Sequence, residues 1–111
     1  MPFGMGRIGK QVARRAAAFE MTILGCDPVW DEAFCNQYSV ERFIAAEELL
    51  PKADFVSLHM NLTPENRWFI NRQRLGLMKP TAYLINCARG ALVHPADVVE
   101  ALKKGALAGY A

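Results

Sequence analysis

A glycine-rich hexapeptide near the amino terminus, Gly4-Met5-Gly6-Arg7-Ile8-Gly9, constrains the fold more than any other part of the sequence. In a G-x-G-x-x-G sequence that opens a helix, Gly4 permits a tight turn, Gly6 lets a ligand approach the backbone, and Gly9 lets the helix pack closely on a strand. The N–H groups of Arg7 and Ile8 would lie at the positive end of the helix dipole, where a phosphate binds. A plain tight turn needs the same glycines, so the hexapeptide alone leaves both interpretations open.

Short apolar runs alternate with helical patterns along the rest of the chain. The apolar runs cover residues 21–26, 55–60, 82–86 and 106–111, and the helical patterns cover residues 7–19, 46–50, 71–78 and 95–103. The runs are nearly continuous in apolar character, which is typical of parallel strands covered on both faces. This order predicts an α/β fold with a doubly wound parallel sheet. Residues 28–42 are predicted to form a loop with at most a short strand.

Capping residues indicate where helices begin and end. Thr63-Pro64-Glu65 predicts a helix start with proline in the first position, and His94-Pro95 predicts another start with a weaker cap. Lys103-Lys104-Gly105 predicts a helix end, because a basic last turn is followed by glycine.

The composition excludes several classes of protein. With 111 residues, 52% hydrophobic residues and a net charge of +2, the chain fits one globular domain and not a disordered segment. The small net charge gives no reason to expect nucleic acid as a partner, and no apolar stretch is long enough to cross a membrane. The three cysteines match neither a disulfide framework nor a zinc site, so we expect a cytoplasmic protein without a metal.

A carboxylate follows the glycine motif at an informative distance. Asp27 ends the second apolar run, 18 residues after Gly9, where an acidic residue is expected to accept hydrogen bonds from ribose hydroxyl groups. A solvated carboxylate at a strand end is the alternative for this residue. No arginine follows Asp27 directly, since residues 28–30 are Pro-Val-Trp, so the sequence favours NAD over NADP as the cofactor.

A second polar cluster, Asn86-Cys87-Ala88-Arg89-Gly90, follows the strand predicted at 82–86. The ligand crevice of an open α/β sheet lies outside the carboxyl ends of its strands. Arg89 there could bind the carboxylate of a 2-oxo acid with its planar guanidinium group, although an ordinary surface arginine is an equal alternative. We interpret Cys87 as a small buried residue and not as a nucleophile.

In combination, these segments resemble the cofactor domain of the D-isomer-specific 2-hydroxyacid dehydrogenases, near the D-3-phosphoglycerate dehydrogenases and the hydroxypyruvate/glyoxylate reductases. The resemblance covers nearly the whole chain. The segments that carry it follow in the family's order: residues 47–50, 54–59, 62–64, 70–71, 77–80 and 85–90.

The resemblance implies a Rossmann-like sheet and a role for each site residue. Arg7 and Ile8 would bind the pyrophosphate of NAD and Asp27 its ribose. Four further residues would line the cofactor site: Met60, Thr63, Cys87 and Ala88. Arg89 would be the catalytic arginine, holding the carboxylate and carbonyl of a small 2-oxo acid while a hydride passes to or from the nicotinamide. The parent oxidoreductase would be a homodimer or larger.

The chain also departs from the family. His94 stands where the family has an acidic residue. Only residues 1–3 precede Gly4 where the family has a full first strand, and the chain ends at Ala111 before the family's glutamate and histidine of the catalytic triad. We therefore expect residues 1–111 to form a partial NAD-binding domain, truncated at its first and last strands, without the substrate domain and inactive alone.

Two other functions remain open on the sequence. One is a non-enzymatic NAD-sensing interaction module, like the corepressors related to this family. The other is a different Rossmann-like protein that binds an adenosine-type ligand, in which the stretch around Arg89 would be accidental.

Overall fold

The computed structural model describes the backbone of residues 2–111 and the side chains of residues 4–111. Its strands are all parallel and form two small sheets. The larger sheet has the order β1-β4-β5-β6, with β1 (Pro2–Phe3), β4 (Phe55–Leu58), β5 (Tyr83–Asn86) and β6 (Gly109–Tyr110). The smaller sheet pairs β2 (Leu24–Gly25) with β3 (Glu41–Arg42). The α/β fold predicted from the sequence is confirmed.

The two sheets lie side by side where one continuous sheet was expected. The backbone N–H of Gly4, just after β1, donates to the carbonyl of Cys26, just after β2, at 3.1 Å. The combined order β3-β2 and β1-β4-β5-β6 is that of a doubly wound fold. Strand β1 pairs with β4 at Pro2 and Phe3, and the division between the two sheets lies between β1 and β2.

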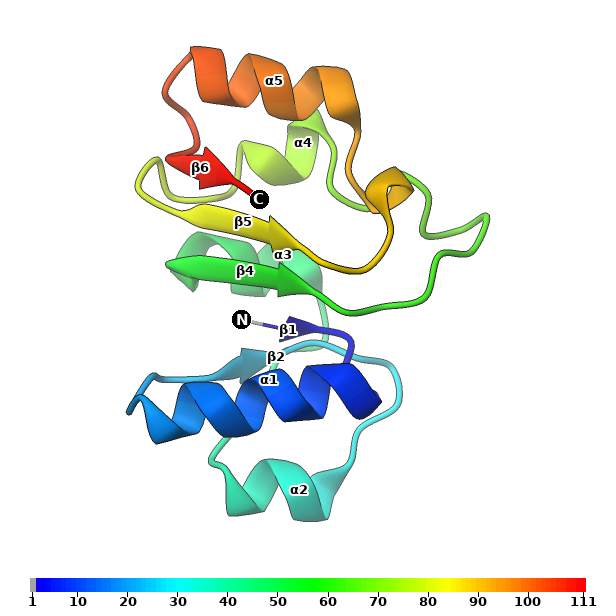
Figure 1. Ribbon diagram of the computed structural model, residues 1–111, viewed down its shortest axis with the longest axis vertical. Coiled ribbons are helices and arrows are strands. Elements are labelled where there is room, and N and C mark those ends of the chain that lie inside the picture. Colours follow the sequence, from blue (N-terminus) through cyan, green and yellow to red (C-terminus); the bar gives the residue numbers. More distant parts are fainter. Residues whose placement is uncertain (1) are drawn as a thin grey trace.

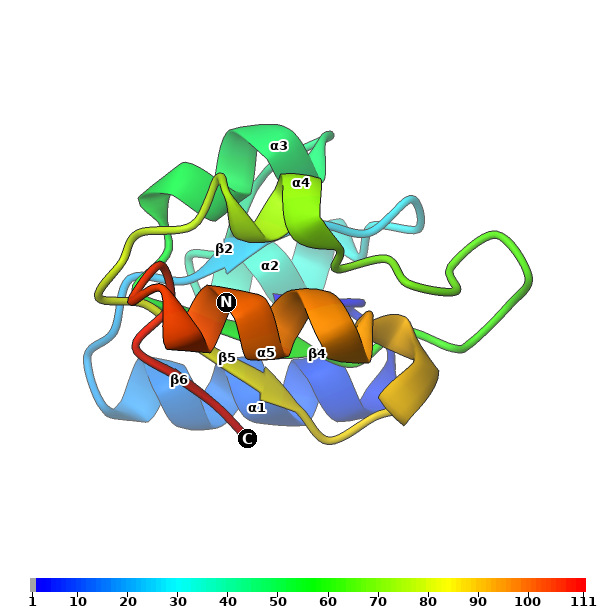
Figure 2. The ribbon, with the colours of Figure 1, turned by 90° about the horizontal axis from the view of Figure 1, so that it is seen from above.

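Helices cover both faces of the strands (Figures 1 and 2). Helix α1 (Arg7–Ala18) lies on one face, and α3 (Ala46–Leu49) and α4 (Arg72–Leu75) lie on the other. Helix α5 (Pro95–Lys103) packs against α4 and β6. Two short 3-10 helices, η1 (Leu50–Lys52) and η2 (Gly90–Leu92), complete the connections.

Two sequence predictions about the loops were wrong. Residues 28–42 contain a helix, α2 (Glu32–Gln37), as well as β3, because the Asp31 side chain accepts a hydrogen bond from the Phe34 N–H at 3.1 Å and caps the helix. The helix start predicted at Thr63 is a turn. The Thr63 hydroxyl does accept from the Asn66 N–H at 3.2 Å, but Trp68 adopts a φ of +55°, which a right-handed helix cannot continue through.

The two other capping predictions agree with the structure. His94 is the N-cap of α5, where its Nδ1 accepts from the Asp97 N–H at 3.3 Å. At the other end, Lys104 is the C-cap and Gly105 follows with a φ of +70°, a conformation that glycine adopts without strain.

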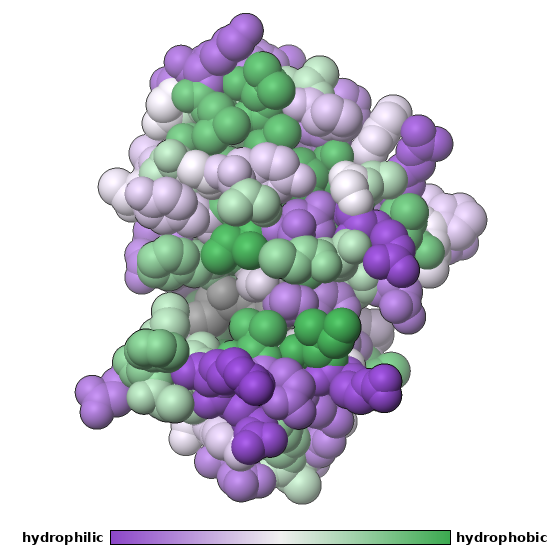
Figure 3. Space-filling view, in the orientation of Figure 1, coloured by the Kyte–Doolittle hydropathy of each residue, from purple (hydrophilic) through white to green (hydrophobic). Residues whose placement is uncertain are grey.

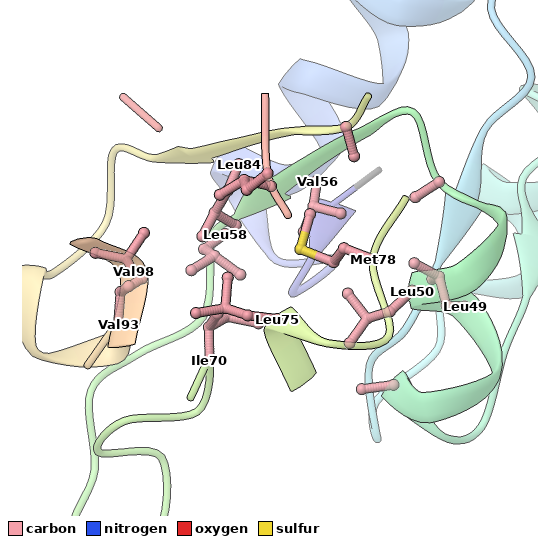
Figure 4. Packing of buried hydrophobic residues seen from close by; sticks show 14 of the residues in the cluster. Leu49, Leu50, Val56, Leu58, Ile70, Leu75, Met78, Leu84, Val93 and Val98 are labelled. Atoms are coloured by element: carbon pink, nitrogen blue, oxygen red, sulfur yellow. The ribbon is translucent and has the colours of Figure 1, made fainter. Parts of the chain in front are cut away.

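Two hydrophobic clusters hold the chain together. The main cluster lies between the larger sheet and the helices α3 to α5, and its centre is formed by Leu58, Ile70 and Leu84, which are fully buried (Figure 4). A smaller cluster packs α1 and α2 around the smaller sheet. Its buried members are Met5, Ala13, Ile23, Cys35 and Val40.

Helix α1 buries small residues and exposes large ones. Gly9 and Ala13 face the sheet, whereas Ile8 is 66% exposed and Phe19 is 81% exposed. The apolar spacing that predicts this helix therefore does not mark its buried face, because the close approach of α1 to the sheet leaves room only for small side chains. Apolar residues gather between α1 and the neighbouring strands on the face seen in Figure 3.

Candidate dinucleotide-binding site

A cleft of about 620 Å³ runs along the carboxyl ends of β1, β2 and β4. This is the edge at which ligands bind in doubly wound folds. The loops after these three strands supply most of its lining: Gly4, Gly6, Arg7 and Ile8; Cys26, Asp27 and Pro28; and His59, Met60, Asn61, Thr63, Asn66 and Phe69. The structure thus brings together seven of the residues predicted from the sequence: Gly4, Gly6, Arg7, Ile8, Asp27, Met60 and Thr63.

The three glycines of the hexapeptide lie in three different environments. Gly4 has a φ of +96°, and a Cβ atom there would lie 2.8 Å from the backbone of His59. A Cβ atom on Gly9 would lie 1.9 Å from the carbonyl oxygen of Gly4, so Gly9 packs behind the turn and does not line the cleft. A Cβ atom on Gly6 would meet nothing within 4 Å, so Gly6 leaves open space in the cleft.

The amino terminus of α1 points its polar backbone groups into this open space. Gly6 is the N-cap and provides no side chain, and the first turn contains no acidic residue. The N–H groups of a first helical turn have no acceptor within the helix, and the helix dipole adds partial positive charge at this end. The turn therefore offers donors to an anion at Arg7 and Ile8, without a carboxylate of its own to compete.

Asp27 is held in place by two backbone groups. Its Oδ2 accepts from the Met5 N–H at 2.5 Å, and its Oδ1 accepts from the Val29 N–H at 2.8 Å. Each carboxylate oxygen can accept a further hydrogen bond, so Asp27 is oriented and still able to bind hydroxyl groups. The anion site at α1 and this hydroxyl site open into one cleft, and these residues fit the pyrophosphate and ribose of a dinucleotide.

His59 and Cys26 are titratable residues of the cleft that the sequence did not mark as site residues. The Nε2 atom of His59 lies 2.6 Å from the hydroxyl oxygen of Ser57, which is buried, and burial lowers the pKa of the imidazole. The place of His59 directly after a central strand could have identified it. Asn61, Asn66 and Phe69 were also missed, and no local pattern marks them.

A second cleft of about 430 Å³ continues the first along the same edge. It shares Ile8, His59, Met60 and Asn61 with the first cleft. Its remaining lining is Leu62, Cys87, Ala88 and Arg89, so the structure places the three predicted residues of the second motif in reach of the first.

Asn86 fixes the backbone that carries Arg89. Its Oδ1 accepts from the Ala88 N–H at 3.1 Å, and its Nδ2 donates to the Arg89 carbonyl at 2.9 Å. The Arg89 guanidinium group itself is exposed and donates only to the carbonyl of Ala88 at 3.1 Å among the contacts of the described residues. Cys87 is exposed, so its interpretation as a buried residue was wrong, because the turn directs it into the cleft.

Within residues 2–111, no cluster of three or more His, Cys, Asp or Glu side chains could hold a metal ion. In the same range, none of the helices has the length and apolar character needed to cross a membrane.

Comparisons with known proteins agree with this geometry. Residues 3–111 match the family model of the D-isomer specific 2-hydroxyacid dehydrogenase NAD binding domain. The chain is 45% identical over 102 residues to a D-3-phosphoglycerate dehydrogenase of Methanocaldococcus jannaschii, covering 92% of this chain and 20% of the relative. It is 46% identical over 106 residues to a glyoxylate reductase of Korarchaeum cryptofilum, covering 96% of this chain and 32% of the relative.

Solved structures give the same result. The NAD complex of a D-isomer specific 2-hydroxyacid dehydrogenase from Lactobacillus delbrueckii superposes with a TM-score of 0.93 at 35% identity, over 98% of this chain and 32% of that one. A D-lactate dehydrogenase from Aquifex aeolicus, complexed with NAD and lactic acid, superposes with a TM-score of 0.93 at 37% identity, over the same shares. The chain spans about a fifth to a third of the length of these proteins.

Proposed function

Because this chain belongs to the family of D-isomer specific 2-hydroxyacid dehydrogenases, as its NAD binding domain, we propose that it holds NAD for an oxidoreductase that interconverts a D-2-hydroxy acid and a 2-oxo acid. The names of the similar dehydrogenases and reductases support this class of substrate. The same names do not favour a non-enzymatic NAD-sensing module. We also propose that the whole protein forms a homodimer or a larger assembly.

The observation that carries the proposal is the continuous edge on which the two clefts meet. The N–H groups of Arg7 and Ile8 bind the pyrophosphate, and Asp27 binds the ribose hydroxyl groups. The residues that line the rest of the cofactor site are Met60, Thr63, Cys87 and Ala88. Bound NAD supplies the hydride acceptor, which no side chain can replace.

Arg89 is the residue of this chain that binds the substrate. Its guanidinium group stays charged at any physiological pH and can hold a carboxylate and a neighbouring carbonyl oxygen together. Because Asn86 fixes the Arg89 backbone from both sides, the arginine reaches the second cleft from a defined position.

Binding experiments on the chain test the cofactor part of the proposal. NADH fluorescence titration is expected to show saturable binding, with NADPH at least about tenfold weaker because its 2′-phosphate would meet the Asp27 carboxylate. Asp27→Asn is expected to weaken NADH binding and to narrow the difference between the two cofactors. Equal affinities for NADH and NADPH in the unchanged chain would contradict the role of Asp27.

The role of Arg89 is tested with oxalate, an unreactive stand-in for a 2-oxo acid, on the NADH-saturated chain. Amide chemical shifts of Ala88 and Arg89 are expected to titrate with oxalate, and Arg89→Gln is expected to abolish the titration while NADH still binds. Arg7→Gln is the matched control, because it removes the same charge from the pyrophosphate side of the site. The oxalate titration is expected to persist in this variant. Oxalate binding that survives Arg89→Gln would remove Arg89 from the substrate site.

A further inference from the structure

A second arginine, Arg67, lies on a segment next to the one that carries Arg89. The loop between β4 and α4 and the segment that holds η2 lie at the same end of the larger sheet (Figure 1). The two segments pair in parallel, and the Trp68 N–H donates to the Ala91 carbonyl at 2.8 Å. Arg67 directly precedes Trp68, and Arg89 comes shortly before Ala91. The pairing therefore brings the backbones of the two arginines to adjacent positions.

A groove of about 380 Å³ adjoins the second cleft on the side of Arg67. We call it the side groove, and its described lining is Leu62, Thr63, Pro64, Arg67 and Ala91. Leu62 lines the second cleft as well, so the two cavities meet at this residue. A 2-oxo acid whose carboxylate binds Arg89 therefore has room for its side chain across Leu62, toward Arg67.

The path between the two arginines carries positive charge without a carboxylate. Arg67 and Arg89 are the charged side chains among the described residues that line the second cleft and the side groove. His59 lines the second cleft too, but burial lowers its pKa, so it is neutral near pH 7. Glu65 is exposed and lines neither cavity. Among the described residues, the ion pairs include neither of the two arginines.

The surroundings of Arg67 orient its side chain and leave its charge in place. The guanidinium carbon lies 4.7 Å from the centroid of the Trp68 ring, within the range of a cation–π interaction. The backbone N–H of Arg67 donates to the Thr63 carbonyl at 3.1 Å, which fixes the turn that carries it. A guanidinium group over a ring keeps the N–H donors at its edge for an anion.

We propose that Arg67 determines substrate specificity by binding a second anionic group, at the far end of the side chain of the 2-oxo acid that Arg89 holds. The substrate class is then a 2-oxo acid, or the matching 2-hydroxy acid, with a carboxylate or a phosphate-type group on a short side chain. The inference rests on the proposed function, since it needs Arg89 at the substrate carboxylate. Because Arg67 is exposed, the second ion pair is expected to improve affinity about two- to fivefold.

Three ligands of similar length test the proposal on the NAD-saturated chain. 2-Oxopentanoate ends in a methyl group, 2-oxoglutarate in a carboxylate, and 2-oxo-4-phosphonobutanoate in a phosphonate. Titrations followed by the amide chemical shifts of Ala88 and Arg89 are expected to show both double anions binding about two- to fivefold more tightly than 2-oxopentanoate. The difference is expected to shrink in about 0.5 M salt, because exposed charges are screened.

Variants of Arg67 identify the group that causes the difference. Arg67→Gln is expected to remove the advantage of the double anions and to leave 2-oxopentanoate binding unchanged, whereas Arg67→Lys keeps the charge and most of the advantage. The double anion that loses more affinity in Arg67→Gln shows whether the second group is a carboxylate or phosphate-type. In the unchanged chain, the Nε–H resonance of Arg67 is expected to shift with the double anions and not with 2-oxopentanoate.

Arg72→Gln is the matched control. It removes the same charge from an exposed arginine of α4 that lines neither the second cleft nor the side groove. This variant is expected to keep the advantage of the double anions. If Arg67→Gln fails to fold, the Nε–H resonance of Arg67 in the unchanged chain decides.

The outcomes distinguish this inference from the function on which it rests. Equal affinities of the unchanged chain for the three ligands, or an advantage of the double anions that survives Arg67→Gln, overturn the role of Arg67 alone. An Nε–H resonance that does not respond to the double anions does the same. A chain that binds none of the three ligands, or that binds 2-oxopentanoate equally well after Arg89→Gln, overturns both proposals.

Discussion

At the scale of single residues, two glycines of the hexapeptide serve different purposes: Gly9 is needed for folding and Gly6 for ligand binding. Gly9→Ala would place a methyl group 1.9 Å from the Gly4 carbonyl oxygen, so we expect it to lower the free energy of unfolding by about 1–3 kcal/mol or more. Gly6→Ala meets no neighbour and is expected to change stability by less than about 1 kcal/mol. Its methyl group would instead occupy the cleft and weaken NADH binding.

Urea unfolding and NADH titration of the two variants check this contrast. The matched pair introduces the same methyl group three residues apart. If both variants lose similar amounts of unfolding free energy, the close packing of Gly9 against Gly4 is not the reason that position 9 requires glycine.

His59 gives the stability of the chain a pH dependence of known sign. Because burial lowers the pKa of His59 in the folded state, the unfolded chain takes up the proton first as pH falls through about 6.5. The free energy of unfolding is therefore expected to fall from pH 7.5 toward pH 5.5, a range in which carboxylates with ordinary pKa values near 4 scarcely titrate.

His59→Gln is the variant that isolates this contribution. Glutamine can still hydrogen-bond to Ser57 but does not titrate, and His94 stays in both proteins. The difference in unfolding free energy between the two proteins, measured by urea at each pH, is expected to shrink or reverse on acidification. Parallel pH profiles would assign the dependence to other groups.

At the scale of elements, the start of α5 depends on a histidine cap. His94→Ala removes the acceptor for the Asp97 N–H and is expected to cost about 1 kcal/mol of unfolding free energy. His94→Asn keeps an acceptor at the N-cap and is expected to recover most of that loss, less the contact of the His94 ring with Trp68, whose centroid lies 4.4 Å away. Thermal unfolding of both variants measures the difference, and an asparagine no better than alanine would argue against capping.

The helices also show which sequence patterns were sufficient to predict an element. Helices α1 and α5 have 12 and 9 residues, long enough for periodicity and caps to agree. Helix α2 has six residues, too few for a periodic pattern, and only its Asp31 cap could have indicated it. At Trp68 a tertiary contact fixes the backbone conformation, since the Trp68 N–H donates to the Ala91 carbonyl at 2.8 Å. No local propensity predicts this hydrogen bond.

At the scale of the whole molecule, the location of the site was easier to predict than its walls. Asp27 and Arg89 each follow a predicted strand, the glycine motif opens a predicted helix, and parallel strands bring their carboxyl ends to one edge. The position of Phe69 in the cleft depends on how the loop after β4 folds back on α4, where Arg74 contacts Phe69, and no spacing in the sequence predicts this. Likewise, the division of the sheet follows from pairing that becomes visible only in three dimensions.

From that division we expect two parts of the chain to open separately. The smaller sheet with α1 and α2 has its own hydrophobic cluster, and the cleft takes walls from both units, with Asp27 on one side and His59 on the other. Without ligand, amide hydrogens of residues 5–40 are expected to exchange faster than those of β4 and β5, because this unit can unfold locally while the larger sheet stays intact.

NADH would contact both parts and stabilise the closed state. At a free NADH concentration of a hundred times the dissociation constant, binding adds about 2.7 kcal/mol to the free energy of any opening that breaks the site. Amide exchange in residues 5–40 is therefore expected to slow most. Deuterium exchange followed by mass spectrometry measures this, and uniform protection of both units would show that they unfold together. The same ligand that fills the cleft is thus expected to stabilise the packing of the smaller sheet against the larger one.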